Sequence, residues 1–484
     1  MLGLLGAGVS AGAGVVVALI LTRVLPAAEA GTFFVVTSVF LLCQTVAKLG
    51  TNTSLVYFIS RFRSLDVPER IRGCLRTAFG PVLGVSLLMS VAMFAAAPWL
   101  IDALLGGPSN QAQTALRVLA VMVPVASVAD AAVSATRGFD TMVPTVVLDR
   151  VGRSLLQVLA VALAVLLGWE AAGILVAAWV LPYLLPAVLG SRDLRHRVRT
   201  AAGDRPMAAE PLGAGEFWRF TGPRALASIA QIALQRLDIV LVAALLGPVP
   251  AAVYTAATRV LIVGQLSNQA ISSAVEPRLG ELLARDDVTA TNAAYRAATA
   301  WLVLLNWPLY LLFALFAPVV LSVFGPAYSA GQSVVLILSS VMLLASACGM
   351  VNLVLIMAGR TTWNLANAVL ALGVNVGVDL LLIPRMGIAG AAVGWAVAIA
   401  VSNLVALAQI YLIKGLHPFG VGTLVAMALS LACFGAIPGA ALLLFGGGTT
   451  TMLLSVLAAT AAYGLGCYRL REPLAVNIFR RRTA

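Results

Sequence analysis

Long apolar runs follow one another along almost the whole chain, each near the length needed to cross a bilayer. A transmembrane helix needs about 20 apolar residues, because its backbone polar groups must be satisfied within the segment when no water is present. Short polar stretches separate fourteen such runs, which predict helices at residues 2–25, 31–57, 78–105, 112–136, 143–167, 173–189, 223–246, 251–276, 297–324, 331–357, 365–383, 388–413, 421–445 and 452–468. The pattern predicts an all-α polytopic membrane protein with about fourteen transmembrane helices.

Composition agrees with lipid as the main solvent of the chain. Hydrophobic residues make up 61% of the 484 residues and charged residues only 10%, whereas a soluble domain has about 25% charged residues. The first run is followed by Ala28-Glu29-Ala30, which imitates the cleavage site of a secretory signal. No Lys or Arg precedes that run, so the charged segment that opens such signals is absent and we interpret the run as a helix of the protein.

Lysine and arginine gather in alternate loops. They lie between the second and third helices, between the fourth and fifth, between the sixth and seventh, after helices eight, ten and twelve, and at the end of the chain: Arg61, Arg63, Arg70, Arg72, Arg76, Arg137, Arg192, Arg195, Arg197, Arg199, Arg205, Arg278, Arg285, Arg360, Lys414, Arg480, Arg481 and Arg482. The intervening loops at 106–111, 247–250, 325–328 and 446–450 carry neither residue. Because basic loops stay on the cytoplasmic side, both termini are predicted to be cytoplasmic.

An internal repeat divides the chain. Residues 24–33 and 245–254 align without a gap, and Ala172-Gly173-Ile174 is echoed by Ala389-Gly390-Ala391. Both echoes run in the same sense, which indicates two six-helix lobes related by an axis along the membrane normal. The predicted organisation is therefore an N-lobe at 1–190, a cytoplasmic linker at 191–222, a C-lobe at 223–413, and two further helices with a basic cytoplasmic tail at 414–484.

Three stretches resemble a known family. Residues 21–31 are similar to the opening signature of the polysaccharide transporter family, although the Gly that usually precedes Pro26 is missing. Residues 236–241 and 386–392 extend the likeness. That family belongs to the multidrug, oligosaccharidyl-lipid and polysaccharide exporter superfamily. The resemblance implies two lobes around a cavity that opens alternately to each side.

The same resemblance implies a function and partners. It implies a flippase of the bacterial cytoplasmic membrane that moves a polyprenyl-diphosphate-linked oligosaccharide to the outer leaflet, for lipopolysaccharide or exopolysaccharide assembly. Besides membrane lipids, the expected partners are the glycosyltransferases and polymerase of that pathway. A coupling ion, Na⁺ or H⁺, or the membrane potential is expected to drive transport.

Charged side chains inside the apolar runs are candidates for the substrate site, because a charge at bilayer depth is costly unless it faces a partner or a wet cavity. Guanidinium groups suit a diphosphate, and the cationic candidates are Lys48, Arg150, Arg153, Arg236 and Arg259. Arg150 and Arg153 are three residues apart and are expected to share a helix face. The polar residues expected to line the cavity are Asn52, Gln157, Gln235, Asp238, Gln265 and Asn268.

An alternative is that these cations pair internally. Arg150 or Arg153 would then pair with Asp149, and Arg236 or Arg259 with Asp238. Other polar residues within the runs are interpreted as structural partners between helices; they are Asp130, Asn364, Asn367, Asn375 and Asp379.

Several other functions are disfavoured. The five cysteines are scattered and the two histidines, His196 and His417, lie in predicted loops, so neither a metal site nor a cofactor is expected. The net charge of +12 is explained by the loops and does not require nucleic acid. An enzyme would need paired acids in a large outer loop, and Asp102 and Glu170 are isolated. A multidrug exporter and a lipid II flippase of the same superfamily remain the alternatives, and mid-depth cations favour an anionic substrate over a cationic drug.

Overall fold

Helices make up all of the regular structure in the residues that the computed structural model describes, which are 2–202, 213–472 and 474. The chain forms two compact units, Met1–Ala252 (unit 1) and Val253–Ala484 (unit 2). Arg205 of the predicted linker and Arg480 to Arg482 of the predicted tail lie outside the described residues. The predicted lobe limits at 190, 222 and 413 stay a prediction.

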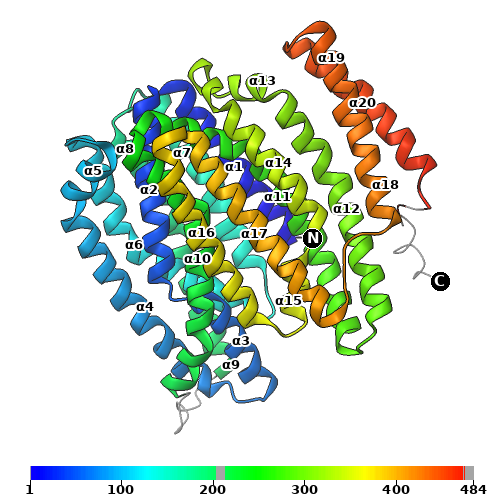
Figure 1. Cartoon of the computed structure of the whole chain (residues 1–484). Coiled ribbons are helices and arrows are strands. Elements are labelled where there is room, and N and C mark those ends of the chain that lie inside the picture. The colour runs from blue at the N-terminus through cyan, green and yellow to red at the C-terminus, as the bar shows by residue number, and fades with distance from the viewer. Residues whose placement is uncertain (1, 203–212, 473, 475–484) are drawn as a thin grey trace. The chain divides into compact units, whose positions relative to one another are not determined.

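Unit 1 is built around one long central helix, α6, which packs against α2, α3, α4 and α8 (Figure 1). Its helical elements are α1 (Leu2–Val24), α2 (Ala27–Ala47), α3 (Thr51–Ser64), α4 (Glu69–Ala95), α5 (Ala97–Leu105), α6 (Asn110–Arg137), η1 (Thr145–Arg153), α7 (Ser154–Leu166), α8 (Ala172–Val180), η2 (Leu181–Tyr183), η3 (Pro186–Gly190), α9 (Ser191–Ala202), α10 (Ala214–Leu246) and the start of α11 (Pro248–Ala284). The helix α9 occupies part of the stretch predicted to be a linker.

The predicted second helix at 31–57 is broken in the middle. Leu49 and Gly50 both have positive φ, 52° and 69°, and they separate α2 from α3. A Cβ atom at Gly50 would lie 2.5 Å from the backbone nitrogen of Ala225 on α10, so this position needs glycine for both its backbone conformation and the close approach. The break leaves Lys48 as the residue that caps α2.

The predicted fifth helix at 143–167 is also irregular. Its first part, η1, is a π-helix, and α7 continues it. Among the described residues thirteen helices are long and apolar enough to cross a membrane. The crossing predicted at 143–167 is absent from that set, because Asp149, Arg150 and Arg153 place three charged residues within it. π-Helical segments are rare in proteins, and those that occur are often found at functional sites.

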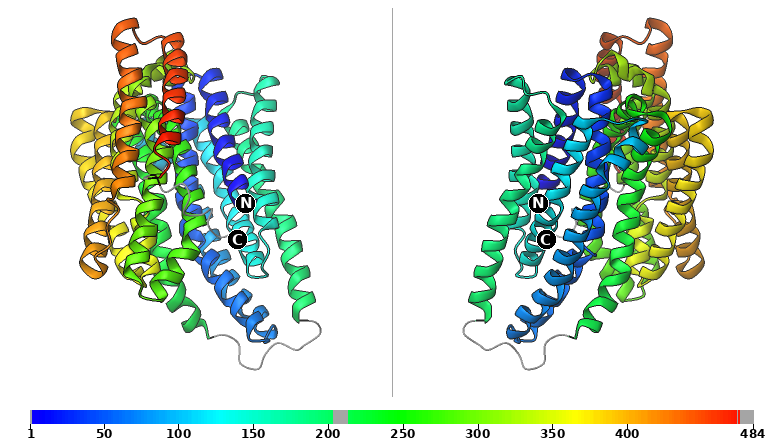
Figure 2. Two further views of the ribbon diagram at one scale, coloured as in Figure 1. Left: turned by 90° about the vertical axis from the view of Figure 1, so that its right-hand side faces the viewer. Right: turned by 90° about the vertical axis from the view of Figure 1, so that its left-hand side faces the viewer.

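Unit 2 continues with α11 and is centred on α12, α14 and α17. Its other elements are α12 (Val288–Leu315), α13 (Ala317–Ser322), η4 (Pro326–Gly331), α14 (Gln332–Cys348), α15 (Val351–Met357), α16 (Thr361–Met386), α17 (Ile388–Lys414), α18 (Val421–Ser430), η5 (Leu431–Ala436), α19 (Ile437–Phe445) and α20 (Thr449–Arg469). The last two crossings, orange and red in Figure 2, pack side by side and against α12.

Candidate functional site

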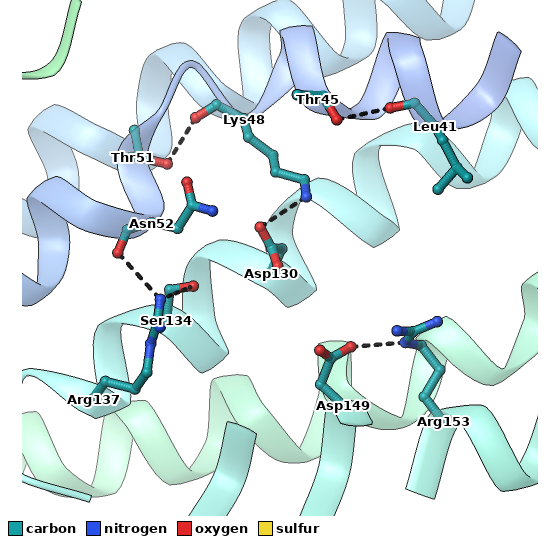
Figure 3. A network of polar contacts seen from close by, with 10 residues as sticks. All are labelled: Leu41, Thr45, Lys48, Thr51, Asn52, Asp130, Ser134, Arg137, Asp149 and Arg153. Atoms are coloured by element: carbon teal, nitrogen blue, oxygen red, sulfur yellow. Dashed lines mark hydrogen bonds and ion pairs between the residues drawn. The ribbon is translucent and has the colours of Figure 1, made fainter. Parts of the chain in front are cut away.

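A lysine at the α2–α3 break meets an aspartate in the middle of α6. The Nζ atom of Lys48 lies 3.1 Å from Oδ2 of Asp130, and both side chains are largely withdrawn from solvent, 20% and 26% exposed. Figure 3 shows the lysine reaching across from α2 toward this carboxylate. The backbone oxygen of Lys48 accepts a hydrogen bond of 2.8 Å from the hydroxyl of Thr51, which stabilises the break. Sequence reasoning interpreted Asp130 as structural and did not connect it with Lys48.

Arg153, at the end of η1, is held by three groups. Its Nε donates to Oδ1 of Asp149 at 2.7 Å and its Nη1 donates to Oε1 of Gln157 at 3.1 Å. Its guanidinium also lies over the ring of Tyr183, 4.5 Å from the centroid. Gln157 is itself fixed, because its Nε2 donates to the backbone oxygen of Trp179 at 2.8 Å. The predicted internal pairing of Arg153 with Asp149 is therefore confirmed.

The side chains of Arg150 and Arg153 have different hydrogen-bond partners. The Nη1 atom of Arg150 donates to the backbone oxygen of Gly3 on α1 at 2.6 Å. The expectation that the two arginines share a face assumed an α-helix and is wrong here, because the segment has π-helical geometry, with i→i+5 hydrogen bonds. The positive charge of Arg150 repels that of Arg137 at the end of α6. Arg137 donates a hydrogen bond to the hydroxyl of Ser134 at 3.2 Å.

Tyr183 lies beneath the guanidinium group of Arg153. The ring is buried, 6% exposed, and is packed edge-on by Phe40, with the ring centroids 5.9 Å apart. Tyr183 thus connects Arg153 of η1 to Phe40 of α2, and the sequence offered no signal for it.

The charged residues in this part of unit 1 carry more positive than negative charge. Five cations and three carboxylates, connected by these contacts and electrostatic interactions, make up what we call the cationic cluster: Lys48, Arg137, Arg150, Arg153, Arg236, Asp130, Asp149 and Asp238. The excess is two positive charges. In surroundings of low dielectric such an excess attracts an anion strongly. Among the described residues no group of three His, Cys, Asp or Glu side chains could hold a metal ion.

The predicted polar lining is only partly near this cluster. The backbone oxygen of Asn52 accepts a long contact of 3.5 Å from Arg137. Asp238 is buried, 2% exposed, and its Oδ1 accepts from the backbone nitrogen of Ile239 at 2.9 Å. Gln235 is exposed on α10.

The remaining candidates belong to unit 2. Arg259 is half-buried on α11, and Gln265 and Asn268 are exposed on the same helix. Asn367 is confirmed as a structural partner between helices, because its side-chain amide exchanges hydrogen bonds of 2.7 and 3.0 Å with that of Gln409 on α17. Asn375 donates to Asp379 within α16 at 3.1 Å.

The chain is similar to a known protein family in sequence and to solved structures in fold. A family model described as "Polysaccharide biosynthesis protein" matches residues 2–283. The fold is similar to a lipid II flippase, MurJ, in an inward closed conformation, with a TM-score of 0.76, 12% identity, and coverage of 97% of this chain and 98% of that one. No curated protein matches the chain in sequence.

Two further solved structures show the same fold. One is an inward-facing multidrug resistance MATE family transporter of the MOP superfamily, with a TM-score of 0.69, 16% identity, and coverage of 84% and 96%. The other is a MOP superfamily transporter from Pyrococcus furiosus, whose binding pocket is described as having reverse polarity. Its TM-score is 0.59 and its identity 18%, with coverage of 85% of this chain and 93% of that one. These similarities confirm the predicted all-α, multi-pass fold.

Proposed function

Because the chain belongs to the polysaccharide biosynthesis protein family, we propose that it is a flippase that moves a polyprenyl-diphosphate-linked oligosaccharide from the inner to the outer leaflet. The family and the fold, which is similar to that of MOP superfamily transporters, support a transporter rather than an enzyme. The proposed transport operates by alternating access and supplies surface polysaccharide assembly. The glycosyltransferases and polymerase of that pathway are its proposed partners, and both termini are proposed to be cytoplasmic.

The excess positive charge of the cationic cluster is the observation that supports this proposal. A diphosphate carries two adjacent anionic groups, and guanidinium forks bind phosphate oxygens with two parallel hydrogen bonds. Arg153 lies 4.5 Å from the ring centroid of Tyr183, Lys48 caps α2, and Arg236 lies on α10 of the same unit. A diphosphate headgroup would therefore meet three cations from three different elements.

The internal carboxylates suit a site that is empty part of the time. Arg153 and Lys48 are paired with Asp149 and Asp130 in this structure, so neither of these two cations is left without a carboxylate when the site holds no substrate. An arriving diphosphate would compete with the carboxylates for the same cations. Both pairs adjoin irregular backbone, at the α2–α3 break and in η1, where a change of conformation needs the fewest broken helical hydrogen bonds. A coupling ion, Na⁺ or H⁺, or the membrane potential would supply the energy.

A lipid II flippase is the second candidate. The observation that favours it is the similarity to MurJ over 97% of the chain. The cationic cluster does not separate the two substrates if both present a diphosphate, so the distinction depends on the sugar. A multidrug exporter for cationic drugs is disfavoured, because the charge excess repels cations.

The test is a deletion strain complemented with variants of the cluster. Arg153→Gln and Arg236→Gln should each let lipid-linked oligosaccharide accumulate in the inner leaflet. Each should slow translocation about tenfold or more, since a hydrogen bond to a charged group contributes roughly 1.5–3 kcal/mol. Arg285→Gln is the matched control, because Arg285 is exposed and paired with Glu281.

Two results would count against the proposal. Normal surface glycan from both variants, at wild-type protein levels, would show that the cluster does not handle the headgroup. Normal glycan in the deletion strain with accumulation of peptidoglycan precursor would favour the lipid II alternative.

A further inference from the structure

The basic end of unit 2 contains an apolar groove beside an arginine that has no acidic partner among the described residues. The groove has a volume of about 570 Å³ and is lined by Leu404, Leu407, Ala408 and Tyr411 of α17 together with His417 and Phe419 of the following loop. The four helical residues follow the 3, 4, 7 spacing of one helix face. Leu404, Tyr411 and Phe419 are 47%, 57% and 45% exposed, so this apolar groove opens outward from the unit.

The loop that closes the groove is held in place by hydrogen bonds. The backbone nitrogen of His417 donates to Oδ1 of Asn292 on α12 at 3.1 Å. The hydroxyl of Thr423 donates to the backbone oxygen of Pro418 at 2.9 Å. Gly415 ends α17 with a positive φ of 67°. The wall formed by His417 and Phe419 is therefore built into the unit, and a ligand would not have to order it.

Arg296 of α12 lies behind this wall. Its Nη2 contacts Nε2 of His417, which faces the groove. Its Nε atom is buried and makes no hydrogen bond. Among the described residues no carboxylate forms an ion pair with Arg296, whereas the neighbouring Lys414 is paired with Asp286 at 2.5 Å. A positive charge with no carboxylate partner among the described residues thus lies directly behind the His417 wall of the apolar groove.

We propose that this groove binds an anionic phospholipid of the leaflet that faces the basic end of the protein. The acyl chain would lie against Leu404, Leu407 and Ala408, and the phosphate would lie at His417 and Arg296. An apolar chain joined to a phosphate matches the groove and its charged end, and guanidinium groups bind phosphate well. A net negative headgroup is favoured over a zwitterionic one, because the cations at this end repel a positively charged terminus.

This site is separate from the proposed transport site, since it belongs to unit 2 and uses none of the residues of the cationic cluster. Binding here would attach the protein to the lipids around it, and it would neither require nor predict translocation of the bound lipid. Failure of one proposal therefore leaves the other standing.

The test is native mass spectrometry of the full chain, delipidated and then titrated with phosphatidylglycerol or phosphatidylcholine of the same acyl chains. The wild type should retain phosphatidylglycerol in preference. Arg296→Gln should weaken that binding roughly fivefold, because a cation near the membrane surface contributes about 1 kcal/mol toward an anionic lipid. Arg296→Lys should restore most of it. Arg285→Gln, which changes an exposed arginine paired with Glu281, is the matched control.

Ala408→Trp keeps the arginine and fills the groove, and it should remove the tightest phosphatidylglycerol adduct. Ala408 is exposed, so the bulky side chain need not disturb the core. Equal retention of both lipids by the wild type would overturn the proposal, as would an unchanged preference in both variants. Binding of a polyprenyl phosphate in place of phosphatidylglycerol, or an Ala408→Trp variant that loses a dimer rather than a lipid, would assign the groove to a different occupant.

Discussion

Lys48 and Asp130 form an ion pair of 3.1 Å that joins the end of α2 to the middle of α6. Both side chains are mostly buried, so removal of one partner leaves the other charge uncompensated in a medium where that is costly. We expect Lys48→Met and Asp130→Leu each to lower the free energy of unfolding by roughly 1–3 kcal/mol, and the double variant to lose less than the sum. Thermal unfolding in detergent of the three variants measures this coupling, and strictly additive losses would contradict it.

Tyr183 should matter through its ring more than through its hydroxyl. Arg153 lies 4.5 Å from the ring centroid, and Tyr183→Phe keeps this cation–π contact, which contributes about 0.5–2 kcal/mol. Tyr183→Leu keeps apolar bulk but removes it. We expect the Leu variant to translocate substrate severalfold more slowly per folded molecule, and the Phe variant to stay close to the wild type. Equal rates for the two variants would mean that the ring does not position Arg153.

Gly31 of α2 lies directly against the start of α11. A Cβ atom at Gly31 would lie 1.9 Å from the backbone oxygen of Pro248, and neither backbone can yield without shifting its helix. Gly31→Ala should therefore destabilise unit 1 by about 1–3 kcal/mol. Gly80→Ala on α4 is the control, because nothing lies within 4 Å of its added Cβ, and there the better helix propensity of Ala should be neutral or stabilising. The melting temperature of Gly31→Ala should fall, and that of Gly80→Ala should stay the same or rise.

A pH-dependent contact holds the loop between α11 and α12 to the end of α17. The hydrogen bond and the positive charge of Lys414 hold the pKa of the exposed Asp286 carboxyl below its usual 3.8. A lowered pKa in the folded state means that the contribution is fully present above pH 3.8 and is lost as the pH falls through the folded-state value.

The variant Asp286→Asn tests this contact. Asp286 has a positive φ of 54°, which Asn tolerates, so the substitution removes the charge and little else. The melting temperature of the wild type should exceed that of the variant by a small amount from pH 7 to pH 5, and the difference should vanish on further acidification and in high salt. A difference that grows as the pH falls would contradict the assignment.

The two segments that align in the sequence lie against each other within unit 1. Gly31 belongs to the first copy of the repeated segment, 24–33, and Pro248 belongs to the second, 245–254. The two copies pack on each other at these residues. Alignment of the segments indicated a relationship between them, and the close approach of Gly31 to Pro248 explains why the first copy has the smallest residue there.

What the sequence determined by itself was the set of helices, because an apolar run of bilayer length has few other ways to satisfy its backbone. It also marked Lys48, Arg153 and Arg236 as charges that need an explanation. Only the tertiary structure decided where each charge is directed. The break at Leu49 and Gly50, the π-helical turn at η1 and the burial of Tyr183 depend on how helices pack, and helix rotation determines whether Lys48 meets Asp130 or an empty face. Hydropathy is local along the chain, whereas an ion pair between α2 and α6 is a property of their packing.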